Sequence, residues 1–154
     1  MTTLRDIQDF LALHRLAVVG VSRNPKDFTR ALFREFLQRG YDAVPVHPDV
    51  REIDGVTCYA TLLGVAPPVE GAVLLTSPRV TEDVVRECAA AEIHRVWMYR
   101  AGGHGAVSPA AVRFCGQNGI RVVEGECPFM FFSQTPWIHR AHGVCRKVFG
   151  HYPQ

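Results

Sequence analysis

Short apolar runs alternate with amphipathic segments along most of the chain. In the amphipathic segments, apolar residues recur at three- and four-residue spacing, which predicts helices. These helices cover residues 3–14, Thr29–Arg39, residues 80–91, the segment from Ser108-Pro109 to Asn118-Gly119, and Pro136–Phe149. The apolar runs between them predict strands at Leu16–Gly20, Asp42–Val46, Gly71–Leu75, Arg95–Tyr99 and Ile120–Val123.

Strands that alternate with helices in this way form βαβ units, whose strands are parallel and whose crossovers are right-handed. The pattern therefore predicts an α/β fold, a Rossmann-like doubly wound parallel sheet of five strands with helices on both faces. A length of 154 residues corresponds to one domain, 1–154, with an N-terminal helix at 3–14 and a C-terminal helical extension at 136–149. Thr29 is the expected N-cap of its helix, and Gly40 the expected stop.

Composition and charge exclude several classes of protein. Lys plus Arg number 17 against 15 Asp plus Glu, with the signs mixed, which is not the electrostatic footprint of a nucleic-acid binder. The apolar runs are far shorter than the ~20 residues of a membrane span, and the first residues lack the apolar block of a signal peptide. Five irregularly spaced cysteines indicate thiols in a reducing cytoplasm. We expect a cytoplasmic protein that binds neither nucleic acid nor membrane.

Ligands of doubly wound sheets bind beyond the carboxyl ends of the strands, near the point where the strand order reverses. After the first predicted strand, a glycine lets a ligand approach the backbone, and the following helix N-terminus offers free N–H groups to an anion. Hydroxyl and cationic side chains accompany them. The candidate phosphate-binding residues are Gly20, Val21, Ser22, Arg23, Lys26 and Thr29. An ordinary loop with solvated basic residues is the alternative.

The second strand ends in His47 and Pro48. Folds that bind NAD place an acidic residue at this tip to hold the ribose 2′-hydroxyl. His47, together with Arg51, would instead tolerate an additional phosphate on the ribose, as in NADP or coenzyme A. A turn histidine with its ring in solvent is the alternative.

Hydroxyl and cationic residues also follow the third predicted strand. Thr76, Ser77 and Arg79 can contact the pyrophosphate or adenine of a nucleotide. They can equally cap the next helix, whose first turn follows directly.

Several segments together resemble a known family. They are Leu16–Pro25, Arg39–Pro48, Ile53-Asp54-Gly55 and Val96–Tyr99, within residues 14 to 128. The chain is similar to the small stand-alone CoA-binding-domain proteins, relatives of the CoA-binding domain of succinyl-CoA synthetase α subunits. The resemblance implies a Rossmann-like domain that binds coenzyme A or an acyl-CoA as a carrier, sensor or regulatory module, with no established reaction.

An enzyme that uses NADP or an acyl-CoA is the alternative, with its chemistry at Cys127 or at the C-terminal histidines. His139, His142 and Cys145 recur every third residue and, with Cys127, could surround zinc. Because no C-x-x-C pair is present, we predict no metal. Glutamates beside Cys127 would raise its pKa, which favours a structural cysteine, so no catalytic residue is predicted. The apolar run Phe129–Phe132 can cover the sheet edge, line an acyl-chain pocket, or contact a second copy or another protein.

Overall fold

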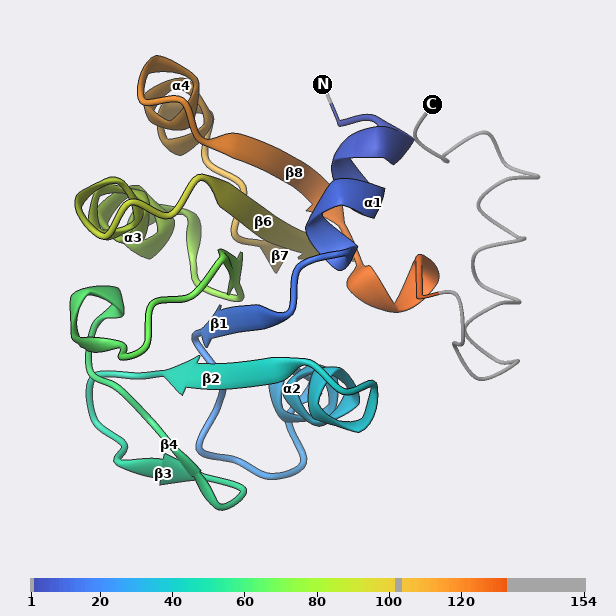
Figure 1. Ribbon diagram of the computed structural model, residues 1–154, viewed down its shortest axis with the longest axis vertical. Coiled ribbons are helices and arrows are strands. Elements are labelled where there is room, and N and C mark those ends of the chain that lie inside the picture. The colour runs from blue at the N-terminus through green and yellow to red at the C-terminus, as the bar shows by residue number, and fades with distance from the viewer. Residues whose placement is uncertain (1, 102–103, 133–154) are drawn as a thin grey trace.

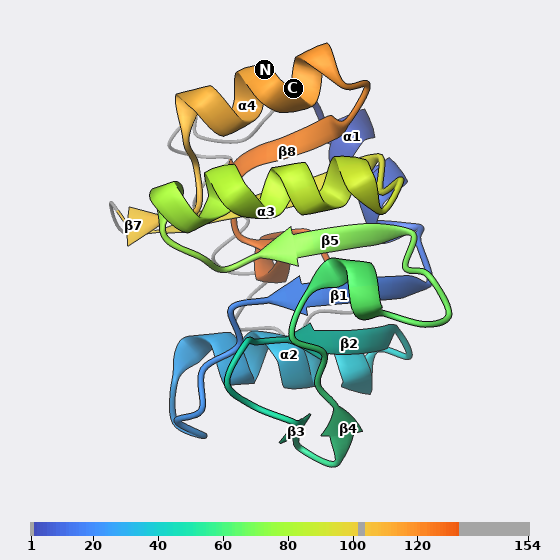
Figure 2. The same cartoon turned by 90° about the vertical axis from the view of Figure 1, so that its left-hand side faces the viewer.

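The computed structural model describes residues 2–101 and 104–132. Within them, five parallel strands lie in the order β2-β1-β5-β6-β8, as Figures 1 and 2 show. The strands are β1 (Arg15–Val19), β2 (Asp42–Val46), β5 (Gly71–Leu74), β6 (Arg95–Ala101) and β8 (Arg121–Glu126). A short strand, β7 (His104–Gly105), pairs antiparallel with the end of β6.

Helices cover both faces of this sheet. In Figure 1, α1 (Leu4–Leu11) and α2 (Phe28–Gln38) lie on one face, and α3 (Pro78–Ala90) and α4 (Pro109–Gln117) lie on the other. Successive residues of a strand point to opposite faces. Along β1, Leu16 and Val18 therefore pack toward α1 and α2, while Ala17 and Val19 pack toward α3. The predicted α/β, doubly wound, Rossmann-like fold is confirmed.

Element boundaries differ from the prediction where side chains cap the helices. α2 begins at Phe28 because Asp27, rather than Thr29, is its N-cap and accepts the Thr29 N–H. α3 begins at Pro78, two residues early, because Ser77 caps it. α1 ends at Leu11, and the amides of His14 and Arg15 donate instead to the Glu70 carboxylate.

Five short elements of the described residues were not predicted from the sequence: β7, β3 (Glu52–Ile53), β4 (Val56–Thr57), and the 3-10 turns Leu62–Gly64 and Pro128–Met130. Each spans two or three residues, too few to show a period. The predicted C-terminal helix, Pro136–Phe149, lies outside the described residues. Among the helices of the described part, none is long and apolar enough to cross a membrane.

Candidate functional site

The strand order reverses between β1 and β5. From β1 the chain passes to α2 and then to β2, while from β5 it passes to α3, on the opposite face, and then to β6. In Figure 2 the loops that follow β1 and β5 leave the same edge of the sheet, the edge formed by the carboxyl ends of the strands. We call Gly20–Asp27 the first loop and Leu75–Ser77 the second loop. In open α/β sheets, ligands bind at the point where two such loops diverge.

The two loops begin in contact at Gly20. This residue has a φ of +93°, and a Cβ placed on it would lie 2.9 Å from the Leu75 carbonyl oxygen and 3.2 Å from Cγ2 of Thr76. Its own N–H donates to the Val46 carbonyl at 3.1 Å. Glycine is therefore required here for packing between the strand ends, a role distinct from the ligand approach that the sequence suggested.

Hydrogen bonds within the first loop hold its conformation. The Ser22 N–H donates to Oγ1 of Thr29 at 2.8 Å, and that hydroxyl donates to the Asp27 carboxylate at 2.7 Å. The Asn24 N–H donates to Oγ of Ser22, and the Lys26 N–H donates to Oδ1 of Asn24, both at 3.0 Å. Thr29, predicted as a ligand contact, thus supports the loop. The side chains of Arg23 and Lys26 are exposed.

The N-terminus of α2 differs from the open anion site that the sequence predicted. The Asp27 carboxylate accepts the Thr29 N–H at 2.8 Å. The hydrogen bond from the Thr29 hydroxyl, and then that from the Thr29 N–H, lower the pKa of Asp27, so its carboxylate is ionised at neutral pH. A phosphate directly on the helix end would meet this negative charge. An anion is therefore better placed over the loop residues that precede Asp27.

The second loop carries two hydroxyls with different surroundings. Oγ1 of Thr76 lies 2.7 Å from Oγ1 of Thr81, in the first turn of α3. The Ser77 hydroxyl accepts the Val80 N–H at 3.4 Å and so acts as the helix cap that the sequence allowed. Arg79 is exposed in the same turn. Because a hydroxyl that accepts one hydrogen bond can still donate another, capping leaves Ser77 able to donate to a ligand.

At the tip of β2, His47 is half-buried. Its ring Nδ1 accepts the Asp49 N–H at 3.0 Å, and the backbone N–H of His47 donates to the Tyr59 carbonyl at 2.9 Å. Since Nδ1 accepts, the neutral ring carries its proton on Nε2, which is a donor. The first residue beyond the strand is therefore a donor rather than a carboxylate, with Pro48 exposed after it.

An aromatic group at the same edge was missed in the sequence. Phe28, the first residue of α2, is 42% exposed, and its ring stacks on Tyr99 of β6 with centroids 5.3 Å apart. Phe129 meets Phe28 edge to face at 5.7 Å. Burial raises the pKa of Tyr99 to about 12, so its phenol remains protonated. An exposed aromatic residue beside a predicted ligand loop is the signal that could have singled out Phe28.

Cys127 follows β8 and is buried. Beside it, the Trp97 indole donates to the Glu126 carbonyl at 2.8 Å. No group of three or more metal-ligating side chains occurs in the part of the chain that the structure describes. His139, His142 and Cys145 lie outside the described residues.

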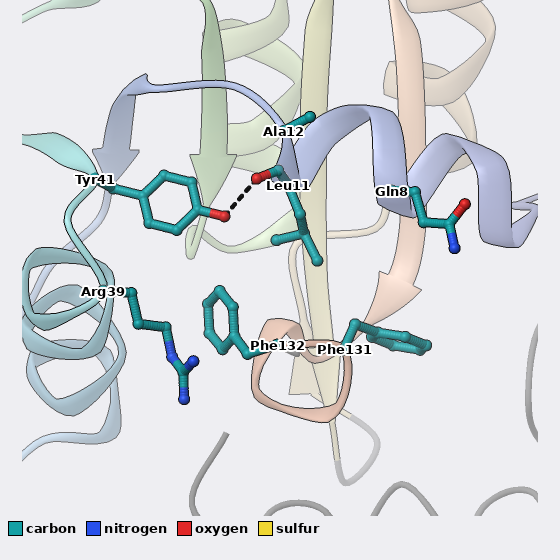
Figure 3. A pocket seen from close by; sticks show the side chains of 7 residues that line it. All are labelled: Gln8, Leu11, Ala12, Arg39, Tyr41, Phe131 and Phe132. Carbon is teal, nitrogen blue, oxygen red and sulfur yellow. Dashed lines mark hydrogen bonds between the residues drawn. The ribbon is translucent and has the colours of Figure 1, made fainter. Parts of the chain in front are cut away.

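A groove of about 490 Å³ lies away from this edge. It is lined by the end of α1, the chain between α2 and β2, and two phenylalanines: Gln8, Leu11, Ala12, Arg39, Tyr41, Phe131 and Phe132 (Figure 3). The Tyr41 hydroxyl donates to the Leu11 carbonyl across it, and the Arg39 guanidinium lies 4.5 Å from the centre of the Phe132 ring. Because α1 and α2 end where β1 and β2 begin, the groove is at the amino ends of the strands.

Comparison with known proteins identifies a family and several solved structures with a similar fold. The model of the CoA binding domain family matches residues 14–132. A conserved hypothetical protein from Pyrococcus furiosus is 28% identical, with a TM-score of 0.67 over 74% of this chain and 95% of its own. A hypothetical protein from Pyrococcus horikoshii OT3 is 23% identical, with a TM-score of 0.75 over 83% and 92%.

A larger protein contains a similar unit. The dinucleotide-forming acetyl-coenzyme A synthetase 1 of Ca. Korarchaeum cryptofilum, in complex with phosphate and ADP, is 23% identical, with a TM-score of 0.68. The match covers 79% of this chain and 28% of the synthetase. At this identity the likeness is one of fold.

Proposed function

Because this chain belongs to the CoA binding domain family, we propose that it binds coenzyme A or an acyl-CoA at the carboxyl edge of its sheet. The observation that carries the proposal is the reversal of strand order between β1 and β5. It brings the first and second loops together at Gly20 and then leads them to opposite faces of the sheet. The point at which two such loops diverge is the ligand position typical of this fold.

In this proposal the pyrophosphate of coenzyme A lies over the two loops. The first loop contributes Ser22, Arg23 and Lys26, and the second contributes Thr76 and Ser77, with Arg79 at its outer side. Arg and Lys attract the phosphates, while hydroxyls donate hydrogen bonds to them. Asp27 keeps the phosphates away from the end of α2.

The two ends of an extended ligand would then lie over the strands on either side. β2 is the neighbour of β1 and β6 the neighbour of β5, so a ligand that crosses both loops would extend from His47 to Tyr99. We assign the phosphorylated ribose to the His47 and Pro48 side, where the strand tip is a donor. The exposed ring of Phe28, stacked on Tyr99, suits the pantetheine chain or an acyl group.

The sequence favours a module that binds its ligand and catalyses no reaction of its own. Such a module acts as a carrier, sensor or regulator of a CoA-using process in the cytoplasm. A second copy of the chain or another protein is its proposed partner.

The proposal is tested by calorimetric titration and thermal unfolding with coenzyme A, dephospho-CoA and NAD at matched concentrations. Coenzyme A should raise the free energy of unfolding, by about 2.7 kcal/mol at a hundredfold excess over its Kd. Dephospho-CoA should bind about tenfold more weakly, because it lacks the phosphate assigned to His47. NAD should give no stabilisation, because the tip of β2 offers no carboxylate.

Two variants locate the site. Arg23→Ala should weaken binding of coenzyme A about tenfold, through loss of a charged hydrogen bond. Arg113→Ala removes another exposed arginine, from α4, far along the sheet from β1, and should leave the affinity unchanged. Stabilisation by NAD that equals that by coenzyme A would contradict the proposed function.

A further inference from the structure

Arg30, in the first turn of α2, is 8% exposed although it carries a full charge. Its Nη1 donates to the carbonyl oxygens of Ser22 and Arg23, both at 3.3 Å. Its Nε and Nη2 donate to the Asp54 carboxylate, at 3.3 and 2.5 Å. A buried guanidinium is destabilising unless its donors are satisfied. Here they are satisfied by the first loop on one side and by the turn between β3 and β4 on the other.

We propose that Arg30 is a positioning residue for the ligand site, setting the direction of the peptide groups of Ser22 and Arg23. The inference rests on the proposed function. In a planar trans peptide the carbonyl and the following N–H point in opposite directions. With both carbonyls turned toward the guanidinium, the N–H groups of Arg23 and Asn24 point away from it.

This arrangement changes what the first loop presents to an anion. Carbonyl oxygens repel a phosphate, whereas N–H groups attract one. Arg30 withdraws two carbonyl oxygens toward α2. The Asn24 N–H is used by the Ser22 hydroxyl at 3.0 Å, which fixes the turn. The Arg23 N–H is the group of this pair that Arg30 orients for the pyrophosphate.

Arg34 provides a matched control within the same network. It binds the same carboxylate, with its Nε 2.9 Å and its Nη2 3.0 Å from the Asp54 oxygens. Its Nη1 donates to the carbonyl of Pro25 at 3.1 Å, further along the loop. Both arginines therefore join the loop to the β3–β4 turn, but Arg30 alone of the two contacts the carbonyls of Ser22 and Arg23. If the ion pairs with Asp54 had only a structural role, loss of either arginine would change ligand affinity to the same extent.

The experiment compares Arg30→Met with Arg34→Met by calorimetric titration with coenzyme A. Arg30→Met should weaken binding about tenfold or more, the effect of one misplaced charge-assisted hydrogen bond. Arg34→Met should leave the affinity nearly unchanged. In the unaltered protein, the backbone amide resonance of Arg23 should shift as coenzyme A is added, and this shift should shrink in Arg30→Met. If Arg30→Met does not fold, Arg30→Lys decides on the same criteria, because one ammonium cannot span both carbonyls and Asp54.

The outcomes separate the two proposals. Equal loss of affinity in both methionine variants would show a general effect on the fold and overturn the positioning role. Unchanged affinity in Arg30→Met would overturn it as well, while leaving coenzyme A binding intact. Absence of binding by the unaltered protein would contradict the proposed function itself.

Discussion

At the end of β1, Gly20 has a backbone φ of +93° and touches the start of the second loop. A side chain at this φ is strained, and its Cβ would also press against backbone of Leu75, which cannot rotate away. The site thus depends on a residue that contributes no functional group of its own. Its contribution is the close approach of the two loops between which the ligand is proposed to lie.

Gly20→Ala should therefore destabilise the protein, by about 2 kcal/mol or more. The matched control is Gly116→Ala. Gly116 lies in the last turn of α4, where an added Cβ meets nothing within 4 Å. Alanine favours a helix by about 0.5–1 kcal/mol over glycine, so this control should be neutral or stabilising. Urea unfolding of both variants measures the difference, and equal effects of the two would contradict the role assigned to Gly20.

Among the elements, the hairpin of β3 and β4 is the smallest, with two residues in each strand. A hairpin of this size is not stable alone. Asp54 in its turn links it to α2 through Arg30 and Arg34. Hydrogen bonds from Arg30 and then Arg34 lower the pKa of Asp54 from 3.8 to about 2. The hairpin, α2 and the first loop are thus joined by one carboxylate.

This link predicts a pH dependence of stability. The folded-state pKa of Asp54 lies below the unfolded value, so its ionised form stabilises the folded state above about pH 4. This stabilisation is lost as the pH falls from about 4 toward 2. Solvent screening of the partly exposed carboxylate limits it to about 1 kcal/mol.

The measurement is urea unfolding of the unaltered protein and of Asp54→Asn between pH 7 and pH 2. The free energies of unfolding should differ at neutral pH and converge below pH 4. Asp49→Asn, in the exposed turn after β2, serves as the matched control and should show no such convergence. A difference that persists unchanged at pH 2 would contradict the assignment.

On the scale of the whole molecule, two cores lie on opposite faces of the sheet. α1 precedes the segment that matches the family, residues 14–132, yet it covers part of one face. Its Phe10 is 1% exposed and meets Trp97 of β6 edge to face, with centroids 5.4 Å apart. The carbonyl of Leu11 accepts the Tyr41 hydroxyl. α1 is therefore an integral part of the core in this chain.

Phe10→Ala should lower the free energy of unfolding by about 3–5 kcal/mol, because it leaves a cavity over Trp97. Gln8→Ala, on the exposed side of the same helix, is the control and should change it by less than about 0.5 kcal/mol. Chemical unfolding followed by circular dichroism measures both. A loss below about 1 kcal/mol in Phe10→Ala would show that α1 is a dispensable addition to the sheet.

The positions and order of the main strands and helices were determined by the sequence itself. Runs such as Leu16–Val19 are apolar on both faces, which is typical of strands covered by helices on each side. Periodicity is a local property, so it is readable without knowing what an element packs against. For the same reason the loops at the strand tips, and hence the region of the candidate site, were identified.

The partners of individual polar groups were decided only by the tertiary structure. The sequence predicts Thr29 as a ligand contact, and the structure adds that its hydroxyl accepts the Ser22 N–H and donates to the Asp27 carboxylate. Arg30 is buried because its guanidinium binds the carboxylate of Asp54, which is 24 residues away in the sequence. The ring of Phe28 stacks on Tyr99, which belongs to β6 in the other half of the sheet. Such contacts depend on how the crossovers bring distant segments together. The spacing of residues within one segment does not show which other segments it will contact.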